Sequence, residues 1–173
     1  MTELTRKANT YLEHSSAGEA YQNLSEAHSI FHLILCAQNK QRPRAKAKEL
    51  CHTWNKLRST SHRLSQLNID ANERMKVIRR AAEYGDHAIE SAIASQNKDR
   101  VAQMQFYRAC VEAKRIHLET MDEPFQAPTD LERRKSREAI IEAWDRLQSI
   151  RGLEMRLYRP LKTQSLSQLD MYS

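Results

Sequence analysis

Helix-start signals recur along this chain and leave little room for β-structure. In a capping box, a hydroxyl or carboxylate at the helix N-cap and a carboxylate three residues later satisfy free backbone amides of the first turn. Three pairs have this spacing: Ser16 with Glu19, Asp70 with Glu73, and Thr129 with Glu132. Only three Gly and four Pro occur in 173 residues, so the turn residues that an antiparallel sheet needs are scarce. The chain is therefore expected to be all-α.

Apolar residues that recur every three or four positions predict six helices. Their expected ranges are 3–14, 17–38, 43–67, 70–95, 97–122 and 129–158. Pro160 is expected to end the last helix, because proline has no backbone N–H to donate. Residues 161–173 are rich in Ser and Gln and are expected to form a flexible tail.

The apolar faces of these helices differ in width. Helices 17–38 and 98–121 carry apolar residues around most of their circumference, whereas the others show one narrow stripe. A helix that is apolar on several sides has to be covered from two directions. These two helices are therefore expected to be central, each with a flanking helix before and after it. This arrangement predicts a six-helix bundle of two stacked three-helix units, residues 1–68 and 69–160.

The first 32 residues resemble a tetratricopeptide repeat, with Leu4 in place of its Trp and Lys7 in place of its Leu. The matching positions are Ala8, Tyr11, Ala20, Leu24 and Ala27. Over residues 3–67 the chain is similar to the MIT (microtubule-interacting and trafficking) domain, a three-helix bundle that begins with a tetratricopeptide-like hairpin. Residues 72–158 would then be a second such unit. The resemblance implies binding of short amphipathic helices in a groove between helices.

The positive charge of the chain is concentrated in one stretch. Residues 40–63 contain eight Lys or Arg and a single acid, Glu49, although the whole chain has a net charge of only +6. On the expected helix 43–67, several basic side chains fall within one arc, away from the apolar stripe that contains Trp54. The side chains expected on or beside this arc are Arg44, Lys48, Arg58, His62 and Arg63. Such an excess of charge favours docking of an acidic partner.

Two other sets of residues could form sites. Trp54 and Trp144 lie on apolar stripes, where each could fill the core or line a groove for a partner helix. His28, His32 and Cys36 share one helical face, and imidazole and thiolate are suitable zinc ligands. These three also border an apolar run, so we expect no metal there and no other cofactor. Neither a Gly-rich phosphate loop nor a nucleophile motif is visible, and we expect no enzyme activity.

The sequence also predicts where the protein works. It has no apolar run of the roughly 20 residues that span a bilayer and no visible secretory signal. Its three cysteines are an odd number without paired spacing, which favours a reducing compartment. We expect an intracellular protein in the cytoplasm, with the nucleus as an alternative.

The leading interpretation is a non-enzymatic adaptor that binds a helical or acidic segment of another protein. Apolar anchors would enter a groove between helices, and the basic face would add rate and specificity. One alternative is a protein that binds nucleic acid or an anionic membrane through helix 43–67. Another is a helical metal-dependent enzyme. Spare apolar surface on the two central helices could equally form a homodimer seam.

Overall fold

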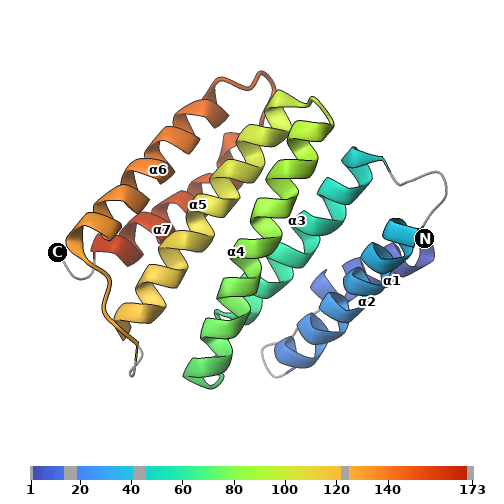
Figure 1. Ribbon diagram of the computed structural model, residues 1–173, viewed down its shortest axis with the longest axis horizontal. Coiled ribbons are helices and arrows are strands. Elements are labelled where there is room, and N and C mark those ends of the chain that lie inside the picture. The colour runs from blue at the N-terminus through green and yellow to red at the C-terminus, as the bar shows by residue number, and fades with distance from the viewer. Residues whose placement is uncertain (1, 14–18, 41–45, 122–124, 171–173) are drawn as a thin grey trace. The chain divides into compact units, whose positions relative to one another are not determined.

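The computed structural model describes residues 2–13, 19–40, 46–121 and 125–170, and these are helical without a strand (Figure 1). The chain divides into two compact units, residues 1–96 and 97–173. The first unit contains α1 (Thr2–Glu13), α2 (Ala20–Lys40), α3 (Ala47–Leu64) and α4 (Ala71–Ala94). The second contains α5 (Lys98–Met121), α6 (Asp130–Gln148), the short 3-10 helix η1 (Met155–Leu157) and α7 (Arg159–Asp170).

The grouping of helices differs from the expected three plus three. The boundary follows Gln96, so the expected boundary at 68/69 falls inside the first unit, between α3 and α4. The expected helix 129–158 ends at Gln148. Pro160 does not stop a helix but occupies the second position of α7, where a missing N–H costs nothing because first-turn amides have no helical partner. Most of the expected flexible tail is therefore helical.

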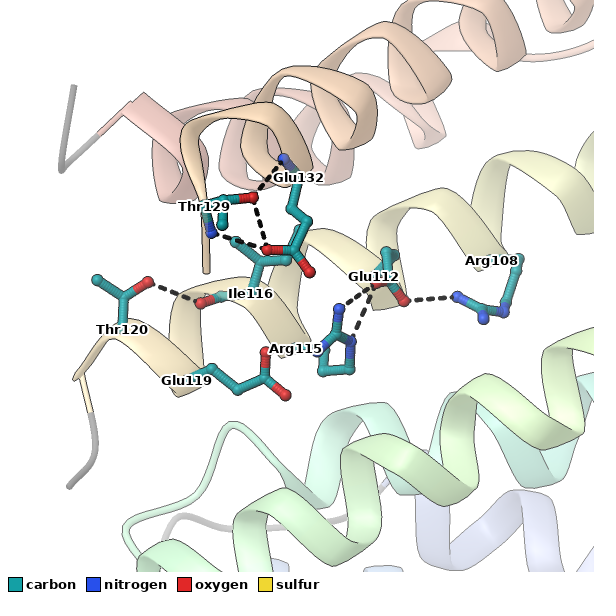
Figure 2. Close-up of polar contacts among 8 residues, drawn as sticks. All are labelled: Arg108, Glu112, Arg115, Ile116, Glu119, Thr120, Thr129 and Glu132. Carbon is teal, nitrogen blue, oxygen red and sulfur yellow. Dashed lines mark hydrogen bonds and ion pairs between the residues drawn. The ribbon is translucent and has the colours of Figure 1, made fainter. Parts of the chain in front are cut away.

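Helix starts follow the local signals closely. The Thr129 Oγ1 atom accepts a hydrogen bond from the Glu132 amide, and the Glu132 carboxylate accepts one from the Thr129 amide, so the capping box is complete (Figure 2). Asp70 Oδ1 accepts bonds from two amides of the first turn of α4. Asn97 Oδ1 accepts from the Arg100 amide at the start of α5, at 2.9 Å. Ser16 lies outside the described residues.

The first unit is a chain of packed neighbours, in which α1 packs on α2, α2 on α3, and α3 on α4. Figure 1 shows α3 running alongside α4. One part of the core joins α1, α2 and α3 around Phe31, and a second part joins α2, α3 and α4 around Leu24, Leu64 and Val77. The expectation for α2 holds only in part: it has a helix on each side, but Leu33 is 62% exposed. One stripe of α2 thus faces solvent.

Helix α3 is the element whose position differs most from expectation. It packs on both α2 and α4, although its narrow apolar stripe predicted a peripheral helix. Several of its polar side chains are buried, including Thr53, Thr60 and Ser61. Thr60 Oγ1 donates to the Lys56 carbonyl at 2.6 Å, and Thr53 Oγ1 donates to the Glu49 carbonyl at 3.2 Å. Because these hydroxyls are satisfied by their own helix, burying them leaves no unpaired donor.

Helix α4 contributes small residues to the first unit. Gly85, Ala81, Ala88 and Ala92 are all buried. Small side chains allow two helix backbones to approach closely, so a larger side chain between them forces the helices apart or into strained rotamers. The packing of α3 therefore depends on side-chain size as much as on hydrophobicity.

This dependence predicts the effect of enlarging Thr60, whose side chain is fully buried. Thr60→Leu should lower the free energy of unfolding by about 1–3 kcal/mol, because the extra volume overpacks the site. Thr60→Val keeps the size, and Ser29→Leu enlarges a small hydroxyl side chain at an exposed position of α2; both should change stability less. Urea denaturation of the three variants measures this. Equal stability of Thr60→Leu and the wild type would contradict the tight packing.

The second unit has an aromatic core. Phe106 of α5 contacts Trp144 of α6 at 6.0 Å between ring centroids, and it meets Tyr158 edge-on at 5.9 Å. Around these rings lie Cys110, Ala113, Ile116, Ile140, Ala143, Leu147 and Leu169. Helix α7 packs on both α5 and α6. The second unit is thus a two-helix pair completed by a short C-terminal helix.

Candidate functional site

Five ring side chains meet at the edge of the first unit's core. His28 and His32 come from α2, Trp54 from α3, and Tyr84 and His87 from α4; we call them the ring cluster. Helical spacing aligns the members on each helix, since positions three or four residues apart share a face. Because α2 and α4 both pack on α3, their side chains converge over Trp54. The ring cluster therefore joins three helices.

The ring contacts are close. The Trp54 ring stacks on His87 with centroids 4.6 Å apart and planes at 29°. Tyr84 lies 5.7 Å from Trp54 and 5.8 Å from His28, so it joins α4 to α2 across α3. Trp54, Tyr84 and His28 are half-buried, whereas His32 and His87 are exposed. Apolar ring surface thus reaches the outside of the unit at this point.

The environment changes the titration of two members of the ring cluster. Burial, followed by the charges of His32 and Arg80, lowers the pKa of His28 to about 4. His28 is therefore neutral near pH 7 and keeps one ring nitrogen as a hydrogen-bond acceptor. Burial is also the largest influence on Tyr84, and its pKa is raised although Arg80 acts in the opposite direction. The ring cluster is uncharged at its centre.

The possible zinc ligands do not form a complete set. Cys36 Sγ lies 3.7 Å from His32 Nδ1, as their spacing predicts. Among the described residues, however, no group of three or more His, Cys, Asp or Glu is arranged to hold a metal ion. His28 instead packs against Tyr84. The hypothesis of a metal-dependent enzyme at His28, His32 and Cys36 gains no support from this arrangement.

Two side chains of the expected basic face of α3, Arg58 and His62, are not at the surface. Arg58 is only 4% exposed and His62 only 7% exposed, and Arg58 Nε donates to Asn55 Oδ1 at 3.0 Å. The reason is that α3 has α2 on one side and α4 on the other, so an arc opposite its apolar stripe is also covered. Arg63 is half-buried, while Lys48 and Lys46 are exposed at the start of α3. Arg44 lies outside the described residues.

The two tryptophans lie in different units and differ in burial. Trp54 is half-buried in the ring cluster. Trp144 is 7% exposed in the core of the second unit, and the Lys162 ammonium of α7 lies 4.4 Å from its ring centroid. Trp144 therefore fills a core in this structure, which is one of the two roles that its apolar stripe allows.

Sequence reasoning missed Tyr84 and His87. The apolar stripe expected on helix 70–95 runs through Gly85 and Ile89 and includes neither Tyr84 nor His87. A signal was nevertheless present, because Val77, Tyr84 and Ser91 are seven residues apart and share a second face of α4. Aromatic and imidazole side chains on a second face of an amphipathic helix indicate such a contact with a further helix.

A separate polar cluster lies on α5, where Arg108, Glu112, Arg115 and Glu119 form a ladder of ion pairs. Figure 2 marks the contacts of Glu112 with Arg108 and Arg115. Burial alone would raise the pKa of Glu112, but hydrogen bonds and charge from Arg115 and then Arg108 lower it overall. The ladder therefore stabilises the fold above the normal carboxylate pKa and loses that contribution as the pH falls. Since each member has a partner on its own helix, we interpret the ladder as structural.

Comparisons with known proteins add no family. No protein-family model matches the chain, and the searches of curated proteins and of solved structures found no match. In the part of the chain that the structure describes, none of the helices combines the length and hydrophobicity needed to cross a bilayer.

The position of His28 predicts a pH dependence of stability. Its pKa falls from 6.5 to about 4 on folding, so between these values the unfolded chain binds a proton that the folded chain does not. The contribution of His28 to the free energy of unfolding is therefore fully present above pH 6.5 and is lost as the pH falls toward 4. His28→Phe should therefore be more stable relative to the wild type at about pH 5 than at about pH 7. Urea unfolding at both pH values measures the difference.

The matched control is Leu33→Phe, which introduces the same side chain at an exposed position of α2 that carries no titratable group. Its stability relative to the wild type should change less between the two pH values. A pH dependence that is the same in His28→Phe and the wild type would show that His28 titrates normally in the folded protein.

Proposed function

We propose that this protein is a non-enzymatic helical adaptor whose first unit binds a helical or acidic segment of a partner protein. The observation that carries the proposal is the ring cluster, which presents half-buried aromatic surface of Trp54 and Tyr84 where three helices meet. Partly exposed aromatic side chains are typical anchors for an apolar partner side chain. The resemblance of residues 3–67 to the MIT domain, and the groove that it implies, are part of this proposal.

Exposed lysines on α2 and at the start of α3, two of the helices that carry the ring cluster, support an acidic partner. Lys48 is exposed in the first turn of α3, Lys46 is exposed at its N-cap, and Lys40 is exposed at the end of α2. Lys48 precedes Trp54 by six residues, about 9 Å along the helix axis. Around the helix axis, however, Lys48 is rotated by about 120° and Lys46 by about 80° from Trp54. The proposal therefore requires a partner segment that places an apolar residue on Trp54 and a carboxylate around the side of α3, toward its start. Such charges mainly raise the association rate and select the partner.

The alternative of nucleic-acid or membrane binding through helix 43–67 has less support. It needs a continuous exposed row of cations, but Arg58 and His62 are buried within α3. Reversing the charge of Arg58 would also leave an acid in a buried position and destabilise the unit. Tests of the basic stretch are therefore best made at Lys46 and Lys48, which are exposed.

The first test uses helical peptides selected from a random displayed library against the wild-type protein. We expect the selected peptides to be rich in Asp and Glu, and Lys46→Glu/Lys48→Glu should slow their association about tenfold at low salt. Arg134→Glu/Lys135→Glu reverses two exposed charges on α6 and serves as the matched control. Association that slows equally in both double variants would point to net charge rather than to this surface.

The second test locates the peptide by tryptophan fluorescence, since the chain contains only two tryptophans. Binding should exclude water from the half-buried Trp54 ring and shift its emission. The shift should persist in Trp144→Phe and disappear in Trp54→Phe. An emission shift that instead depends on Trp144 would contradict the proposed site. The proposal would also fail if the selection yielded no peptide and the protein bound DNA or anionic vesicles.

A further inference from the structure

Helix α7 occupies a surface made by the other two helices of the second unit. That surface, which we call the α7 seat, consists of Phe106 and Cys110 of α5 together with Ile140, Trp144 and Leu147 of α6. Leu161, Leu166 and Leu169 of α7 pack against the same core as these residues. Leu161, Ser165 and Leu169 are spaced by four and therefore share one face of α7. An amphipathic helix thus lies across a two-helix groove.

Polar contacts at both ends set the register of α7. Near its start, the Lys162 ammonium lies over the Trp144 ring and makes a cation–π contact. At its end, Asp170 forms an ion pair with Arg137 of α6. Tyr158, just before α7, stacks on Tyr107 with centroids 5.7 Å apart. The seat therefore recognises a helix by apolar spacing and by an acid beside the last leucine.

Several features make α7 the weakest-held helix of its unit. Only Ser165 and Leu169 of its twelve residues are buried, and the central buried position carries a serine rather than a large apolar side chain. Twelve residues are below the length at which an isolated helix is stable in water. Its last residue is an acid, which opposes the helix dipole at that end. Most of its helicity thus depends on contact with the seat.

The connection to α6 allows α7 to leave while the chain stays intact. Residues 149–158 form turns and the short helix η1, and Gly152 has a φ of +75° that suits glycine. If α7 left, the seat would lose the cover that Leu161, Leu166 and Leu169 give it. A contiguous apolar surface of this kind on a folded unit is typical of an interaction site.

We propose that α7 is a displaceable internal ligand, and that its seat binds a helix of another protein with the pattern Leu, small residue, Leu at four-residue spacing followed by an acidic residue. The chain itself supplies the template, because α7 has this pattern and occupies the seat. While tethered, α7 competes at an effective concentration in the millimolar range, so only a better-fitting helix displaces it. This inference concerns the second unit and is independent of the function proposed for the first.

The test uses a fluorescent peptide with the sequence of residues 158–170 and the full-length protein. Leu161→Asp/Leu169→Asp should prevent the protein's own α7 from docking, and this variant should bind the peptide at least about tenfold more tightly than the wild type. Thr163→Asp/Ser167→Asp places the same charges on exposed positions of α7 and should behave like the wild type. A peptide that carries the two Leu→Asp changes should bind neither.

Hydrogen exchange of the unmodified protein gives a second measurement that does not depend on any variant. The amides of α7 should exchange at least about tenfold faster than those in the middle of α5 and α6, because α7 undocks without unfolding the unit. Equal protection of α7 and α5, or equal peptide affinity of the Leu→Asp variant and the wild type, would overturn the proposal. A wild-type dimer that the Leu→Asp variant loses would instead assign the seat to a second copy of this chain.

Discussion

The two-sided burial of α3 is the constraint on which the first unit depends. A helix with polar hydroxyls at Thr53 and Thr60 can lie between two neighbours because each hydroxyl is bonded to a carbonyl one turn earlier. The small buried residues of α4 leave room for α3 to pack closely against it. Once α2 and α4 flank α3, their side chains meet above Trp54, and the ring cluster follows. The same geometry removes Arg58 and His62 from the surface.

The two units solve the same packing problem in different ways. The first inserts a helix with small polar residues between its neighbours, whereas the second closes an aromatic core with a short helix from the end of the chain. A tight contact made of small side chains has little tolerance for changes in volume. In the second unit, the buried residues of α7 are only Leu169 and a serine. Departure of α7 from its seat would therefore break fewer apolar contacts than separation of the helices in the first unit. The second unit is therefore the better candidate for a conformational change.

Helix starts could be predicted from the sequence, whereas contacts between helices could not. The N-caps at Asp70, Asn97 and Thr129 involve residues at most three positions apart, so the pattern alone specifies the contact. The all-helical class follows from the same signals. The burial of Arg58 could not be predicted, because it depends on which helix lies opposite, and a helical wheel treats each helix alone. The helix after Pro160 was missed because the segment is rich in Ser and Gln, which indicated a flexible tail, although Leu161 and Leu169 have helical spacing.

Packing alone does not account for the imidazoles of the ring cluster. An apolar side chain at position 28 would fill the same space without the proton uptake that disfavours the folded state below pH 6.5. What an imidazole adds is a ring nitrogen that can hydrogen-bond at an otherwise apolar surface. His87 combines both properties: its ring stacks on Trp54, and its Nδ1 lies 3.2 Å from the Glu90 carboxylate. In the proposed complex, a partner that contacts Trp54 would therefore meet aromatic area and polar groups together, and that combination would give specificity as well as affinity.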